Sequence, residues 1–121
     1  MIRVLLVDDD ENVRYTLARV LRKAGYEVVE AEEGGEALEC LNKQPVDVVV
    51  TDILMPGMEG IETIMKLREQ AAALPIIAIS GGGRVGLGEY LESAKLLGAD
   101  YTFEKPFDER ELIARIEELA A

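Results

Sequence analysis

Histidine is absent from this chain of 121 residues, and its absence excludes several kinds of active site. Without an imidazole there is no serine-protease-type triad, no histidine general base and no zinc-hydrolase site with histidine ligands. The single cysteine, Cys40, rules out an internal disulfide and gives no support to secretion. Because Cys40 lies in a helical apolar pattern, we expect it to be a small buried hydrophobic residue.

Long apolar runs and positive charge are also scarce. The first apolar run, 4–7, meets three aspartates directly, which no signal peptide tolerates, and nothing approaches the ~20 apolar residues of a membrane helix. The 13 Lys and Arg face 24 Asp and Glu, a formal net charge of -11. Because phosphate binding needs a basic face, nucleic acid and anionic membrane are poor direct partners. We therefore expect a cytoplasmic protein that binds neither.

The rest of the composition fits one globular domain over residues 1–121. Apolar residues make up 49% and charged residues 31% of the chain, as in ordinary soluble proteins. A chain of this length buries ~65–70% of its unfolded surface, which is enough for a core without disulfides or metals. The sequence shows no linker, low-complexity segment or convincing repeat.

Short runs of apolar and β-branched residues recur along the chain. They lie at 4–7, 26–29, 46–51, 76–79 and, more weakly, 101–103. Three of these runs are nearly continuous instead of alternating with polar residues. Continuous runs are typical of strands buried on both faces of a parallel sheet.

Helical patterns separate these runs. The first apolar stripe consists of Val13, Leu17, Val20, Leu21 and Ala24, with Gly25 as a helix stop. Patterns at 37–41, 61–68, 91–97 and 112–119 predict four more helices, and Asp108 with Glu111 resembles a capping box before the last. This βα order, repeated five times, predicts a doubly wound α/β fold: a five-stranded parallel sheet with helices on both faces. The flavodoxin-like strand order 2-1-3-4-5 is expected, while other doubly wound orders remain open.

Polar residues follow the predicted strands where ligands bind in open α/β sheets, beyond the carboxyl ends. Asp8-Asp9-Asp10 follows the first strand, Asp52 ends the third, Ser80 the fourth, and Lys105 comes after the fifth. Gathered carboxylates repel each other, and a Mg²⁺ ion with carboxylate, water and phosphate ligands would relieve that repulsion. Lys105 adds a point charge suited to a phosphate. We therefore expect one shared acidic cleft.

Plainer interpretations exist for each of these residues. A helix N-cap explains one of the three aspartates, a turn before 56–57 explains Asp52, and a solvated strand end explains Lys105. None of them accounts for the acids together, so the shared site is favoured. Five glycines between 81 and 88 favour a flexible connection over a phosphate cradle, because no Walker pattern is present. The Ser80 hydroxyl can still donate to a phosphoryl oxygen.

At this point the sequence resembles the receiver domain of bacterial two-component response regulators over essentially its whole length. The matching segments are 4–10 (VLLVDDD), 48–60 (VVVTDILMPGMEG), 75–80 (PIIAIS), 97–100 (LGAD) and 105–107 (KPF). Each is weak alone, but together they are specific in order and spacing. The resemblance implies a single receiver domain over 1–121, with no output domain and signalling by protein contact.

The resemblance also implies a role for each site residue. Asp52 corresponds to the phosphoacceptor, which takes a phosphoryl group from a sensor histidine kinase or a histidine phosphotransfer protein. Asp8 and Asp9, with Asp52 and the Leu54 backbone carbonyl, correspond to the Mg²⁺ ligands. Ser80 corresponds to the switch hydroxyl and Lys105 to the lysine that pairs with the phosphoryl group. The family catalyses only its own phosphorylation and slow dephosphorylation, so we expect no enzyme, and the downstream protein target is unknown.

One position departs from the family pattern. The aromatic switch residue lies three positions before the lysine in the family, and here that residue is Thr102. Tyr101 has the strand parity of Phe103 and Lys105, so it should point to the opposite face from Thr102.

Three other functions remain open at this stage. A phosphorylation-independent interaction module would keep the acids as relics. A phosphatase with an aspartyl intermediate fits poorly, because that family places both acids as Asp-x-Asp after one strand. A flavin binder shares the architecture, but the cleft acids would repel the phosphate of FMN.

Overall fold

The computed structural model describes residues 1–53, 60–80 and 98–120. Its centre is one five-stranded sheet in the order β2-β1-β3-β4-β5, in which every neighbouring pair is parallel. The strands are β1 (Arg3–Val7), β2 (Glu27–Ala31), β3 (Val48–Asp52), β4 (Ile76–Ser80) and β5 (Tyr101–Glu104). The predicted fold class and strand order are confirmed.

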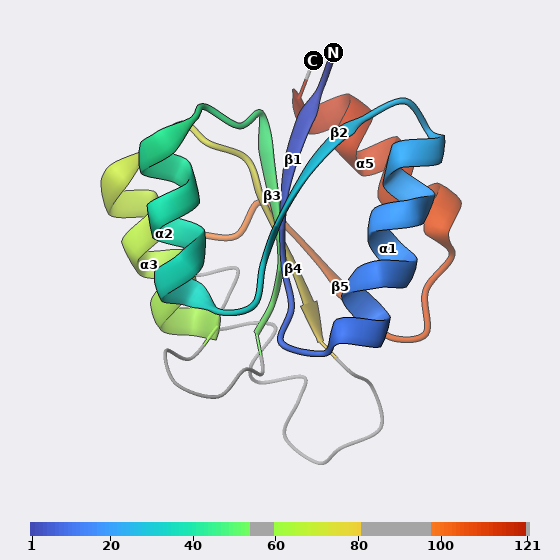
Figure 1. Ribbon diagram of the computed structural model, residues 1–121, viewed down its shortest axis with the longest axis horizontal. Coiled ribbons are helices and arrows are strands. Elements are labelled where there is room, and N and C mark those ends of the chain that lie inside the picture. The colour runs from blue at the N-terminus through green and yellow to red at the C-terminus, as the bar shows by residue number, and fades with distance from the viewer. Residues whose placement is uncertain (54–59, 81–97, 121) are drawn as a thin grey trace.

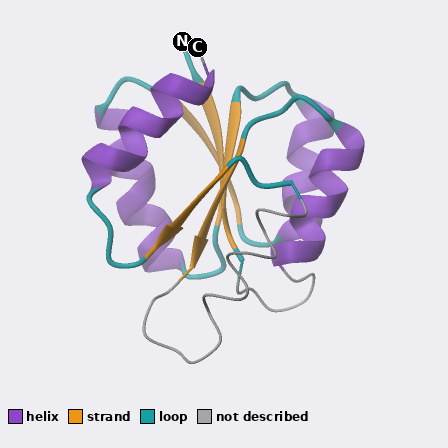
Figure 2. Ribbon diagram, turned by 180° about the vertical axis from the view of Figure 1, so that it is seen from behind, coloured by secondary structure: helices purple, strands orange, loops and turns teal. Residues whose placement is uncertain are grey.

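Helices cover both faces of this sheet. They are α1 (Glu11–Lys23), α2 (Gly34–Lys43), α3 (Gly60–Gln70) and α5 (Glu109–Ala120). Figures 1 and 2 show α1 and α5 on one face of the sheet and α2 and α3 on the other. The helix predicted over 91–97 lies outside the described residues. Among the helices that are described, none is long and apolar enough to cross a membrane.

Figure 1 shows the N-terminus beside the end of α5, where strand β1 begins. The carboxyl ends of the strands, and the start of α1, lie at the opposite end of the sheet. The candidate site residues follow the carboxyl ends of strands, so they lie far from both chain ends.

The sheet has a core on each face. The first cluster, under α1 and α5, includes Val4, Leu6, Val48, Val50, Ile77, Ile79, Phe103, Leu17, Leu21, Leu112 and Ile116. The second cluster, under α2 and α3, includes Leu5, Val7, Val49, Ile76, Ala78, Ala37, Ile64 and Leu67. Neighbouring residues of the central strands thus enter opposite cores, which explains their continuous apolar runs. Cys40 packs against the second cluster, but it is half-buried and not fully buried as expected.

Two strands begin later than the apolar patterns predict. Tyr26 precedes β2, because its N–H donates to the Leu21 carbonyl at the end of α1 (3.1 Å) and its hydroxyl donates to Glu117 (2.6 Å). Residues 46 and 47 precede β3, where Asp47 accepts a hydrogen bond from the Arg3 backbone N–H (2.7 Å). In both places an apolar residue packs beside the sheet without joining its ladder.

Both ends of α1 are fixed by local hydrogen bonds. The Asp10 carboxylate caps the first turn by accepting from the backbone N–H groups of Asn12 (2.9 Å) and Val13 (3.1 Å). At the other end Gly25 has a φ of +98°, which L side chains rarely adopt, and its N–H donates to the Arg22 carbonyl (3.0 Å). The predicted helix stop at Gly25 is confirmed.

Arg68, in the last turn of α3, ties together three segments at the end of the sheet where the strands begin. Its guanidinium donates to the carbonyls of Ala72 (2.9 Å), Leu74 (2.6 Å) and Gly98, and to Asp100 Oδ2 (3.0 Å). The side chain is about three-quarters buried, with 24% of its surface exposed. One side chain therefore satisfies three backbone carbonyls that would otherwise need water or other donors.

Replacing Arg68 with methionine should lower the free energy of unfolding by roughly 2–4 kcal/mol. The variant leaves these carbonyls without their donor, and it frees Asp100, which also holds the Ile76 N–H (2.8 Å). Urea denaturation followed by circular dichroism measures the loss. Arg110→Met is the matched control, because Arg110 is 89% exposed and pairs locally with Asp108. Equal midpoints for the two variants would contradict the prediction.

Candidate functional site

Two neighbouring strands bring carboxylates to one edge of the sheet. Val7 pairs with Thr51 in the β1–β3 register, so Asp8 and Asp52 are the next opposed pair. Both have the parity of the first cluster, so both side chains point toward the α1 and α5 side. Asp8, Asp9 and Asp52 each offer a carboxylate oxygen, and these oxygens lie within 4.8 Å of one another. The structure thus brings together the three acids that the sequence placed in one cleft.

Lys105 reaches this cluster from the far side of β4. Its backbone N–H donates to the Ser80 carbonyl (2.8 Å), which extends the β4–β5 ladder by one step, and the following peptide bond to Pro106 is cis. The Lys105 ammonium lies 3.9 Å from Asp8 Oδ2 and 4.0 Å from Asp52 Oδ2. Since β3 and β5 are two strand spacings apart, about 9–10 Å, a long side chain is needed to cross β4.

The environment of Asp8 opposes its ionisation. The pKa of this carboxyl is raised to about 6, and burial is the largest cause. The negative charges of Asp52 and Asp9 also raise the pKa, while the hydrogen bond from the Asp10 N–H (2.9 Å) and the charge of Lys105 lower it. The side chain is 4% exposed. One lysine therefore does not fully compensate the acids. Closely spaced carboxylate oxygens with uncompensated charge are the donor set that Mg²⁺ prefers, so the residues present fit that ion.

Ser80 ends β4 between the strands of Asp52 and Lys105, and it is fully buried. Its parity is that of Ala78 in the second cluster, opposite to the parity of Asp52 and Lys105. Thr102 pairs with Ala78, two residues before the end of the ladder, and it is half-buried. Thr102 therefore lies two residues farther than Ser80 from the carboxyl edge of the sheet.

Tyr101 and Phe103 lie on the other face of β5 from Thr102, as the strand parity predicts. Their ring centroids are 4.9 Å apart, and both rings belong to or pack against the first cluster. The guanidinium of Arg115, from α5, lies 4.3 Å from the centroid of the Tyr101 ring. Tyr101, the aromatic residue next to Thr102 in the sequence, thus packs against α5 on the opposite face of β5.

Two residues differ from the site residues expected from the sequence. Leu54, the expected source of a backbone carbonyl ligand, lies outside the described residues. Arg14 was not anticipated, yet its guanidinium donates to the backbone carbonyl of Asp8 (2.8 Å). The available signal was its place six residues after Asp8, early in a helix that starts beside the site. Asp10 caps α1, so the helix-capping interpretation holds for that one aspartate.

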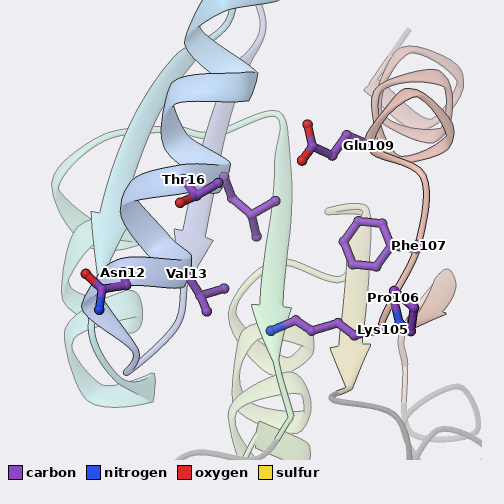
Figure 3. Close-up of a pocket in the computed structure, with 8 residues that line it drawn as sticks. Asn12, Val13, Thr16, Lys105, Pro106, Phe107 and Glu109 are labelled. Carbon is purple, nitrogen blue, oxygen red and sulfur yellow. The ribbon is translucent and has the colours of Figure 1, made fainter.

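A pocket of about 620 Å³ opens beside the cluster, between α1 and residues 105–109. Figure 3 shows its two walls, with Val13 and Thr16 on α1 facing Lys105 and Phe107 on the other side. Lys105 belongs to both the pocket and the acidic cluster, and 29% of its side chain is exposed. The Lys105 side chain is therefore partly accessible to a molecule that approaches from this side.

Comparisons with known proteins agree on one family. Residues 4–117 match the family model described as the response regulator receiver domain. YrkP, a transcriptional regulatory protein of Bacillus subtilis, is 40% identical over 114 residues, which is 94% of this chain and 47% of YrkP. The receiver protein CpdR of Brucella abortus is 37% identical over 122 residues, covering 98% of this chain and 97% of CpdR.

Solved structures agree with this match. The chemotaxis protein CheY4 of Vibrio cholerae superposes with a TM-score of 0.87 at 32% identity, covering 98% of each chain. The chain spans about half the length of the first curated relatives that it matches.

Proposed function

The chain belongs to the response regulator receiver domain family, and from this we propose that it takes a phosphoryl group onto Asp52 within a two-component system. The donor is a sensor histidine kinase or a histidine phosphotransfer protein, and the readout is contact with a downstream protein. The observation that carries the proposal is the convergence of Asp8, Asp9 and Asp52 with the Lys105 ammonium at one strand edge.

The transfer step needs a carboxylate nucleophile and charge neutralisation. An Asp52 oxygen attacks the phosphorus, the bond from phosphorus to the donor atom breaks, and the donor leaves with that electron pair. Lys105, 4.0 Å from Asp52 Oδ2, balances negative charge on the phosphoryl oxygens. Asp8, Asp9, Asp52 and the Leu54 carbonyl would hold Mg²⁺, which when bound supplies further positive charge to those oxygens.

The product is an acyl phosphate, which water hydrolyses, so the signal is transient. Phosphorylation replaces one negative charge at Asp52 with roughly two and adds acceptor oxygens. Ser80 and Lys105 are the two donors in this proposal that respond to the new charge. Ser80 leads directly into residues 81–97, and Thr102 stands where the family carries its aromatic switch. A charge change at Asp52 would thus bias the segment that follows β4.

Intact mass spectrometry tests the proposal directly. The purified chain is incubated with acetyl phosphate and Mg²⁺, and we expect the mass of one added phosphoryl group. The adduct should be lost with EDTA and in Asp52→Asn. Glu104→Gln is the matched control, because it removes the same charge from an exposed position beside Lys105 and should retain the adduct.

The contrary outcome is also informative. A folded wild-type chain that binds Mg²⁺ but takes no phosphoryl group, from acetyl phosphate or from a phosphorylated histidine donor, would overturn the proposal. The phosphorylation-independent interaction module would then be the remaining interpretation.

A further inference from the structure

We propose that Arg14 is a positioning residue for the acidic site. Its guanidinium fixes the peptide that joins Asp8 to Asp9, and it thereby sets the relative directions of these two carboxylates. This inference rests on the proposed function of the site, because it assigns Arg14 a part in preparing the same acids.

The contacts of Asp8 show how tightly this residue is held. Its backbone N–H donates to the Ala31 carbonyl on β2 (3.1 Å), and its carboxylate Oδ1 accepts from the Asp10 N–H (2.9 Å). Its backbone carbonyl accepts from Arg14 Nη1 (2.8 Å). The remaining oxygen, Oδ2, faces Lys105 at 3.9 Å. Arg14 thus supplies the constraint on the carbonyl side of Asp8, where the chain turns from β1 into Asp9.

Arg14 is itself held in place from the β2 side. Arg14 Nε donates to Glu30 Oε1 (3.3 Å), and Nη2 lies 3.8 Å from Glu32 Oε1. Glu30 also accepts a hydrogen bond from Arg22 Nη2, at its other oxygen, Oε2 (3.2 Å), so the Oε1 contact with Arg14 does not require Arg22. The Arg14 side chain is 11% exposed, so its planar fork is already ordered by these partners. The guanidinium is therefore a fixed reference point and not a mobile surface charge.

Rotation of the Asp8–Asp9 peptide would move one carboxylate relative to the other. The Arg14 hydrogen bond opposes that rotation, because turning the peptide breaks a charge-assisted bond to a part-buried carbonyl. Replacing a residue that orients metal ligands through hydrogen bonds typically weakens metal affinity by about 10–100-fold. We therefore expect an effect on affinity and not only on stability.

The test compares Arg14→Met with Arg22→Met. Arg22 shares Glu30 with Arg14 and donates to the Val28 carbonyl, but it does not bond to Asp8. Titration with Mg²⁺ alone, followed by amide chemical shifts, should show affinity about tenfold weaker in Arg14→Met and unchanged in Arg22→Met. Arg14→Lys keeps the charge without the fork and should fall between wild type and Arg14→Met. If Arg14→Met does not fold, Arg14→Lys carries the comparison.

Two further measurements separate positioning from stability. Phosphorylation by acetyl phosphate should slow in Arg14→Met at low Mg²⁺ and recover when Mg²⁺ is saturating. In the metal-free protein, the Asp10 amide hydrogen should exchange faster in Arg14→Met than in Arg22→Met, because its acceptor, Asp8, is less well held.

The outcomes distinguish the positioning role of Arg14 from the proposed phosphoacceptor function. Mg²⁺ affinities within twofold of wild type in Arg14→Met, with equal Asp10 exchange, would overturn the positioning role and leave the proposed function standing. Normal Mg²⁺ binding without phosphorylation in the wild-type chain would overturn the function, while the affinity comparison still decides the role of Arg14. A wild-type chain with no saturable Mg²⁺ binding would overturn both.

Discussion

Replacing Asp8 with asparagine is expected to stabilise the metal-free protein at pH 8 and to remove most of its affinity for Mg²⁺. The carboxyl has a pKa of about 6 in the folded protein, against an ordinary value of 3.8. At pH 8 the folded protein must keep this buried group ionised. At about 1.4 kcal/mol per pKa unit, that costs about 3 kcal/mol of stability. The neutral amide avoids the cost and keeps the shape.

The destabilising effect of the ionised Asp8 carboxylate should depend on pH. Between about pH 4 and pH 6 the folded state binds more protons at Asp8 than the unfolded state does, so the free energy of unfolding contributed by this group falls as pH rises through that interval. Well below pH 3.8 and well above pH 6 the contribution is constant. Asp8→Asn should lack this fall, while Asp10→Asn, which keeps a good helix cap, should retain it.

Urea denaturation in EDTA at several pH values measures the stability effect, and Mg²⁺ titration measures the affinity effect. We expect Asp8→Asn to weaken Mg²⁺ binding by more than the roughly 100-fold that changes to supporting residues cause, since a charged ligand is lost. A variant with the same pH dependence as wild type would contradict the first part. Undiminished Mg²⁺ affinity would contradict the second.

Replacing Lys105 with methionine is expected to tighten Mg²⁺ binding while slowing phosphorylation. The ammonium lies about 4 Å from both Asp8 and Asp52, so it competes with a cation for the same carboxylates. With 29% of the side chain exposed, solvent screens part of this attraction, and we expect about a tenfold gain in affinity.

Although Lys105→Met should bind Mg²⁺ more tightly, its rate of phosphorylation should fall. Removing one donor that stabilises a developing oxyanion typically costs about 10²–10³ in rate, so phosphorylation by acetyl phosphate should fall by about that factor at saturating Mg²⁺. Lys66→Met is the control, since Lys66 lies 3.9 Å from Glu62 in a similar pair on α3, away from the acids. A variant that binds Mg²⁺ more weakly than wild type would contradict the competition argument.

The fold could be predicted from the sequence because the physical signals were redundant. Continuous apolar runs marked strands with two buried faces, and the acids at their ends had to meet at one edge. The strand starts could not be predicted as well. Tyr26 and Val46 have the hydrophobicity of strand residues, and only the strand pairing in the folded sheet shows that the ladders begin at residues 27 and 48.

The candidate site was predictable in its acids and lysine but not in its supporting contacts. Whether Arg14 reaches the Asp8 carbonyl depends on how α1 docks on the sheet, and no pattern of side-chain types encodes that contact. The parity of Asp8, Asp52 and Lys105 became evident once the register of β1, β3 and β5 was known. Leu54 stays an expectation, since it lies outside the described residues.

The placement of the two chain ends opposite the acidic edge has a practical consequence. A tether, affinity tag or fluorescent protein joined at either end would project from the end of the sheet where the strands begin. It would leave the acidic cleft at the other end open to donors and to Mg²⁺. The chain could thus be immobilised on a sensor surface by either end with its reactive edge facing solution. Binding measured in that format would report on the acids themselves.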